Sequence, residues 1–184
     1  MGFLLAQGID VSYLSMSGRL KGRLVAAESK NIVLRMAQFE RALDGPFKLE
    51  LARSIVHRKI HNQRVLVQRY LQNHPASGLE QTERQLERFA DLLEVQETVP
   101  ELMGVEGTAS AAYFRTLGRM LRPEFSFRRR SRRPPKDPVN ALLSLGYTLV
   151  GNELMAILSS LGLDAYLGFL HGVGYGRPSL SLDL

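Results

Sequence analysis

The chain has 184 residues, and 45% of them are hydrophobic, which is enough to bury a core of ordinary size. It contains no cysteine, which excludes disulfides, thiolate metal sites and thiol nucleophiles and favours the reducing cytoplasm. The net charge of +6 favours an anionic partner. We expect no secretory signal and no membrane partner, because no stretch approaches the ~18 apolar residues that span a bilayer.

The N-terminal segment predicts a β-hairpin. Two short strands, Ile9–Leu14 and Leu20–Val25, flank a turn over residues 15–18. A two-stranded hairpin alone is only marginally stable in water. We therefore expect residues 1–27 to be the end of an N-terminal β domain.

The rest of the chain predicts helices. Apolar residues recur at helical spacing over Lys30–Leu43, Phe47–Asn73, Glu80–Gln96 and Val99–Leu121. Glycine and proline interrupt the pattern at residues 44–46 and 74–78. The predicted fold class is mainly α: a helical bundle over residues 28–184, preceded by a short β-hairpin.

A basic segment interrupts the helices. Residues 122–138 contain six arginines and one lysine against two acids, a net charge of +5, with two adjacent prolines and no apolar period. It is a solvated mobile loop or an arm that binds a nucleic acid strand, for which Phe125 and Phe127 are suitable stacking residues. The candidate DNA-backbone ligands are Arg128, Arg129, Arg130, Arg132 and Arg133.

An almost wholly apolar helix is predicted after this segment. Asp137 is a suitable N-cap with Pro138 in the first turn, and the helix should run to Leu161 in a central position. Asp164 then predicts the cap of a short helix that places His171 at its C-terminal end.

Three residues are candidates for chemistry. Glu106 lies among small and apolar residues, either as a salt-bridged glutamate or as a metal ligand held in a tight helix contact. His171 precedes a glycine-rich stretch and is a helix cap, a satisfied core residue or a ligand. Asp183 is a metal ligand, a residue that orients a ligand, or a helix-start residue. With Arg177, a further DNA-binding candidate, the closing segment has the parts of a phosphate-handling metal site.

Taken in order, these segments resemble the CRISPR-associated integrase that captures new spacers. The resemblance rests on the following residues: Ser17-Gly18-Arg19; Asn31, Arg35 and Gln38; Ala52-Arg53, Ile55-Val56, Lys59 and Asn62-Gln63; Gly104–Gly107 with Tyr113-Phe114; Arg132–Pro135 and Asp137–Leu143 with Gly146-Tyr147; Gly162–Asp164, Gly168–His171, Arg177, Ser179-Leu180 and Asp183-Leu184.

The resemblance implies a catalytic helical domain in which a glutamate, a histidine and a late acid bind Mg²⁺ or Mn²⁺. Glu106 and His171 match the first two, whereas Asp183 matches an acid next to the third, which the family carries beyond the position of Leu184. It also implies that this chain lacks most of the β domain and the C-terminal end. The implied reaction is the attack of a DNA 3′-hydroxyl on a repeat phosphodiester. The implied partners are DNA, a second copy of the protein, and a small ferredoxin-like CRISPR-associated adaptation subunit.

Two other functions remain open from the residues alone. One is a non-catalytic basic helical module that binds nucleic acid. The other is a helical interaction subunit that docks a protein through the Glu80–Gln96 face.

Overall fold

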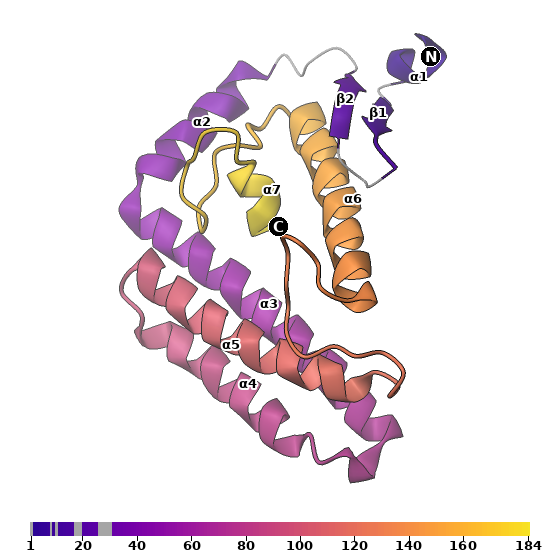
Figure 1. Cartoon of the computed structure of the whole chain (residues 1–184). Helices are drawn as coiled ribbons and strands as arrows, with labels where there is room; N and C mark the ends of the chain where they lie inside the picture. Colours follow the sequence, from indigo (N-terminus) through magenta and orange to yellow (C-terminus); the bar gives the residue numbers. More distant parts are fainter. Residues whose placement is uncertain (1, 8, 10, 17–19, 26–30) are drawn as a thin grey trace. The chain divides into compact units, whose positions relative to one another are not determined.

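The computed structural model describes residues 2–7, 9, 11–16, 20–25 and 31–184, and it is mainly helical, as predicted (Figure 1). The chain divides into two compact units: Leu49–Ala141, and Met1–Lys48 together with Leu142–Leu184. Ser17-Gly18-Arg19, the predicted helix start at Lys30 and the predicted boundary between residues 27 and 28 lie outside the described residues.

The predicted hairpin is present near the N-terminus. After a short helix α1 (Gly2–Ala6), which the sequence analysis missed, β1 (Val11–Leu14) pairs antiparallel with β2 (Leu20–Leu24). Val11 lies opposite Leu24, and the register shifts between Tyr13 and Leu14. In the part of the chain that the structure describes, this sheet has only these two strands.

Three long helices form the core of the Leu49–Ala141 unit. They are α3 (Gly45–Asn73), α4 (Glu80–Leu92) and α5 (Val99–Met120), with the short helices η1 (Pro75–Ser77) and η2 (Leu93–Val95) between them. Their shared interior consists of fully buried aliphatic side chains: Val56, Ile60, Val67, Leu79, Leu86, Leu93 and Leu102. These residues recur at helical spacing, so burying one stripe of each helix holds the three together.

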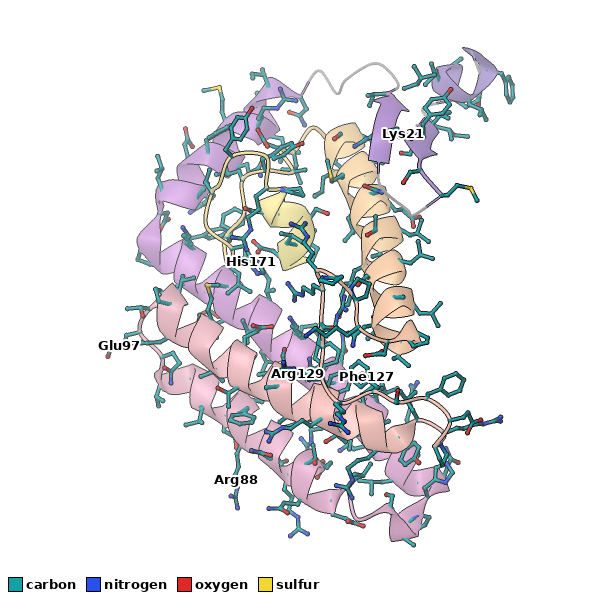
Figure 2. All side chains as sticks on the ribbon, viewed as in Figure 1. Lys21, Arg88, Glu97, Phe127, Arg129 and His171 are labelled. Atoms are coloured by element: carbon teal, nitrogen blue, oxygen red, sulfur yellow. The ribbon has the colours of Figure 1, made fainter. Side chains whose placement is uncertain are left out.

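Ionic contacts join α3 to α4 at the edge of this core. The Arg64 guanidinium contacts Glu83 at 2.6 Å and Glu87 at 2.7 Å, and Gln68 also donates to Glu83 at 2.8 Å. The hydrogen bond with Glu83 raises the pKa of Arg64. Burial alone would raise the pKa of Glu83, but the hydrogen bonds from Arg64 and Gln68 outweigh it and lower that pKa. In contrast, Arg88 points away from the helices (Figure 2).

The second unit contains α2 (Ile32–Leu43), most of α6 (Pro138–Leu161) and α7 (Ser179–Asp183). Gln38 of α2 is buried, and its amide donates to the carbonyls of Asp164 and Leu167 while it accepts from the Asp164 amide at 2.8 Å. Phe47 meets Phe169 edge to face, with ring centroids 6.0 Å apart. These contacts fix the loop that leads to His171.

Helix α6 departs from two predictions. It was predicted to be central, yet only 6% of its most apolar 18-residue window is buried, and Leu142 and Tyr147 are 69% and 60% exposed. Because apolar periodicity does not identify what packs against a helix, it could not predict this exposure. We also expected no stretch of the chain to be long and apolar enough to span a membrane. That expectation was wrong, because α6 has the length and the composition to do so, with a mean hydropathy of 1.5 over this window. A single helix of this kind is weak evidence for a membrane segment.

Candidate functional site

His171 is held by Asp183 through both its ring and its backbone. Asp183 Oδ1 lies 2.8 Å from His171 Nδ1 and accepts from the His171 amide at 2.9 Å. Oδ2 accepts from the amides of Phe169 and Leu170 at 2.6 Å and 3.0 Å. The Asp183 side chain is fully buried, whereas His171 remains 24% exposed beside α7 (Figure 2). One carboxylate therefore fixes three consecutive amides and one imidazole.

This geometry determines which ring nitrogen of His171 is available. Burial by itself would raise the pKa of Asp183, but the hydrogen bonds from the His171 ring and the three amides outweigh it and lower the pKa. Since an ionised carboxylate only accepts, Nδ1 carries the hydrogen, and Nε2 is the ring nitrogen that Asp183 does not contact. A metal-binding histidine is typically oriented in this way.

Two local predictions for this region were wrong. No helix spans residues 164–171; instead, the Asp164 side chain accepts from the Tyr166 amide at 2.8 Å and forms a turn. Asp183 is not a helix-start residue, because it is the last residue of α7. In both cases an aspartate suited to an N-cap is used for other hydrogen bonds, and local sequence does not distinguish the two uses.

Gly168 lets the backbone close around this carboxylate. A Cβ atom there would lie 2.7 Å from the Ser179 Cβ, 2.8 Å from Asp183 Oδ2 and 2.8 Å from the His171 carbonyl oxygen. The Ser179 hydroxyl in turn donates to the Gly172 carbonyl at 2.8 Å. The small residue at 168 is therefore required by the close approach of three groups.

Gly168→Ala is expected to destabilise the protein by about 1–3 kcal/mol, because the methyl group must displace backbone and buried side-chain atoms. Gly172→Ala is the matched control, since a Cβ atom there meets nothing within 4 Å. Urea unfolding of the two variants and the parent measures the difference. Equal unfolding free energies for both variants would contradict the packing described here.

Glu106 lies on α5 and is salt-bridged, one of its two predicted roles. Its Oε1 is paired with Lys59 Nζ of α3 and accepts from the Ser110 hydroxyl at 3.0 Å. The side chain is 21% exposed. The expected tight helix contact is not present, since a Cβ atom on Gly104 or Gly107 would meet nothing within 4 Å.

The basic segment is an ordered loop built around Asn140. The fully buried Asn140 side chain accepts from the Ser131 amide at 2.7 Å and donates to the carbonyl of Arg129 at 2.9 Å and to the Asp137 carboxylate at 2.6 Å. Asp137 caps α6 as predicted, accepting from the Asn140 amide at 2.8 Å. Asn140 was not predicted as the centre of the loop, because its only local signal was an amide in the first turn of an apolar helix.

The arginines of this loop have two different environments. Arg130 turns inward and donates from Nη1 to Asn140 Oδ1 at 2.9 Å and to the Ser131 carbonyl at 2.7 Å. In contrast, five arginines of the segment are exposed: Arg122, Arg128, Arg129, Arg132 and Arg133. A hollow of about 250 Å³ is lined by Ser126, Arg128, Arg129, Ser131, Lys136 and Asp137. Three cations and one carboxylate therefore line this hollow, a balance that suits an anionic ligand.

The two phenylalanines near these arginines also differ. Phe127 is buried, with its ring 6.3 Å from that of Phe114, and a Cβ atom on Gly118 would overlap its carbonyl oxygen. It is therefore a core residue and not a stacking platform. Phe125 is 47% exposed and remains available for stacking.

The predicted site residues fall into separate groups. His171 and Asp183 are in contact in one unit, where Arg177 is exposed, and Glu106 pairs with Lys59 in the other unit. Within the described residues, no group of three histidine or acidic side chains is placed to hold a metal ion. The convergence of Glu106 and His171 on one cation stays a prediction.

Comparison with known proteins identifies the family. The family described as "CRISPR associated protein Cas1" matches residues 1–184. The chain belongs to the Cas1 family. A CRISPR-associated endonuclease Cas1 of Thermus thermophilus is 44% identical over 180 residues, covering 97% of this chain and 51% of the relative.

Solved structures share the Cas1 fold. A casposase bound to integration product matches with a TM-score of 0.86 and 25% identity, covering 99% of this chain and 51% of that one. The Cas1-containing chain of a Cas6-RT-Cas1–Cas2 complex matches with a TM-score of 0.80 and 31% identity, covering 98% of this chain and 20% of that one. The chain therefore spans about half the length of the Thermus Cas1 and of the casposase.

Proposed function

We propose that the chain is the catalytic part of a metal-dependent DNA endonuclease and integrase, which inserts new spacers into a CRISPR array during the adaptation stage of antiviral defence. The observation that carries this proposal is His171, whose ring is oriented by a buried carboxylate through Nδ1, so that Nε2 is the ring nitrogen left for a metal ion. Membership of a family whose relatives are named endonucleases supports it.

The proposed reaction is a direct phosphoryl transfer. The oxygen of a DNA 3′-hydroxyl bonds to a phosphorus of the repeat, the bond from that phosphorus to its 3′-oxygen breaks, and the proton lost by the attacking hydroxyl is balanced by one gained by the leaving oxygen. With water as the nucleophile, the same site is a nuclease. No covalent protein intermediate is needed.

The donors available suit Mg²⁺ or Mn²⁺. Glu106 would supply a carboxylate oxygen and His171 would supply Nε2, and no thiolate exists in the chain. When bound, the cation neutralises charge on the phosphate and polarises it. Asp183 would act as the residue that orients His171, because both of its oxygens already accept N–H groups. The proposal also includes a third acidic ligand, which the family resemblance places beyond the position of Leu184.

The proposed partners follow from the charges and from the relatives. The exposed loop arginines and Arg177 would bind the phosphates of DNA. The casposase was solved with an integration product, and a complex containing Cas1 was solved with Cas2, so we propose DNA and a Cas2-like small subunit as partners. A second copy of the chain, cytoplasmic localisation and the assignment of residues 1–27 to a β domain remain parts of the same proposal.

A second candidate function is a basic helical module that binds DNA without cutting it. The salt bridge between Lys59 and Glu106 favours it, because a carboxylate satisfied by a lysine is also an ordinary structural pair.

A nicking assay separates the two functions. Supercoiled plasmid is incubated with Mn²⁺ and either this chain or a version extended past Leu184 with the acid that the family carries there. The integrase proposal predicts nicking that EDTA abolishes. DNA binding without nicking by either protein would favour the non-catalytic module.

The salt dependence of DNA binding tests the basic loop. Replacing Arg128, Arg129, Arg132 and Arg133 by alanine should lower the slope of log K against log salt by roughly 0.9 for each DNA phosphate that the variant no longer binds. Arg88→Ala and Arg115→Ala, at exposed helical positions, are single-charge controls that should each leave the slope near that of the parent. An unchanged slope in the fourfold variant would remove the loop from the DNA-binding surface.

A further inference from the structure

Four polar side chains link α3 and α5 at Glu106. Lys59 Nζ and the Ser110 hydroxyl both meet Glu106 Oε1, and the Gln63 amide lies 3.5 Å from that hydroxyl. Lys59 and Gln63 are four residues apart on α3, as are Glu106 and Ser110 on α5, so each pair shares one helix face. Lys59 and Ser110 therefore share one carboxylate oxygen, and Gln63 joins them through the Ser110 hydroxyl.

Lys59 is not required to pack the two helices. Its side chain is 44% exposed, whereas the next residue, Ile60, is 1% exposed and belongs to the apolar core. Core residues on the same helix, Val56 and Val67, are also fully buried. The stability of the contact between α3 and α5 thus comes mainly from these aliphatic groups. An exposed lysine on a carboxylate adds little to it.

The position of Lys59 has a direct consequence for cation binding. Its ammonium lies on one carboxylate oxygen of the proposed cation ligand, and its charge repels a divalent cation. Lysine is a mobile point charge on a flexible four-carbon stem, so it can leave the carboxylate without any movement of the backbone.

We infer that Lys59 is the resident counter-ion of Glu106, which a divalent cation must displace before it binds. Lys59 is thus a positioning residue that sets the cation concentration needed to load the site and keeps the carboxylate compensated when the site is empty. This inference rests on the proposed function, because it takes Glu106 as a cation ligand.

Isothermal titration of Mn²⁺ alone tests the inference, with the protein extended past Leu184 as the parent and its Lys59→Met and Lys59→Arg variants beside it. Lys59→Met should bind Mn²⁺ about five- to tenfold more tightly, because no ammonium competes for the carboxylate. Lys59→Arg keeps a cation and should remain within about twofold of the parent. Arg58→Met is the matched control: it removes one exposed positive charge from the adjacent position of α3 and should change the affinity far less.

Each outcome decides between the inference and the proposed function. If the parent binds Mn²⁺ and Lys59→Met binds it equally or more weakly, the counter-ion role of Lys59 is overturned, but the metal site is not. An equal gain in Arg58→Met also overturns it, because the effect would then be general electrostatics. If neither the parent nor Lys59→Met binds Mn²⁺, both the inference and the metal-dependent function are contradicted. Thermal unfolding of each variant detects misfolding, and Lys59→Gln provides a second neutral variant.

Discussion

Asp183→Ala is expected to lower the free energy of unfolding by about 3–5 kcal/mol, the range typical of removing one partner from a buried charged network. The substitution leaves the amides of Phe169, Leu170 and His171 without their acceptor and frees the imidazole ring. Each buried donor left unpaired costs about 1–3 kcal/mol. Urea unfolding followed by circular dichroism measures the loss.

The control is Asp91→Ala, which removes an exposed carboxylate and should change the free energy of unfolding by less than about 0.5 kcal/mol. The pH dependence gives a second check. Because the pKa of Asp183 is lowered in the folded protein, its stabilising effect is complete above the ordinary aspartate value of 3.8 and is lost as the pH falls through the lowered value. The free energy of unfolding of Asp183→Ala should therefore fall less than that of the parent as the pH is lowered through this range. A variant as stable as Asp91→Ala would contradict the described network.

Replacing either proposed cation ligand is expected to have the largest effect on activity. In the protein extended past Leu184, Glu106→Ala and His171→Ala should each reduce Mn²⁺-dependent nicking by roughly 10²- to 10³-fold, because a bound cation supplies several kcal/mol of stabilisation to the transition state. Plasmid nicking at saturating Mn²⁺ measures the loss. DNA binding should change little, since the phosphate contacts are proposed to come from the basic loop.

Matched controls use residues of the same types outside the site. Glu97→Ala removes an exposed carboxylate that points away from the bundle (Figure 2), and His74→Ala removes a histidine stacked on Tyr70 with ring centroids 4.3 Å apart. Both should nick at close to the parental rate. Nicking at the parental rate by Glu106→Ala or His171→Ala would exclude that residue as a cation ligand.

Sequence alone predicted the features that depend on local chemistry. The hairpin, the four long helices from α2 to α5, and the capping of α6 by Asp137 follow from apolar spacing, glycine and proline breaks, and N-cap preference. The interactions that form these elements join residues only a few positions apart, so the local order of residue types is enough to predict them.

The features that sequence did not predict depend on long-range contacts. The carboxylate of Asp183 reaches back 14 residues to the amide of Phe169, and Gln38 binds backbone groups 126 and 129 residues away. The exposure of α6 likewise depends on its neighbours and not on its own composition. Hydrogen bonds of this range leave no periodic signal in the chain.

The site itself was only partly predictable. His171, Glu106 and Asp183 stood out because each polar side chain lies among glycines or apolar residues. Lys59 and Asn140 entered only as residues of the family resemblance, because a lysine on a polar helix face and an asparagine after an N-cap have ordinary surroundings in the sequence. Only the structure identifies the groups to which these two residues are bonded.

A crystal structure of the Mn²⁺-soaked protein, with manganese located by its anomalous scattering, would identify the cation ligands themselves. We expect one manganese bonded to a Glu106 carboxylate oxygen and to His171 Nε2, with His171 Nδ1 still on Asp183 and Lys59 moved away from Glu106. Manganese bound to only one of Glu106 and His171, or to Asp183 in place of its hydrogen bonds, would contradict this expectation.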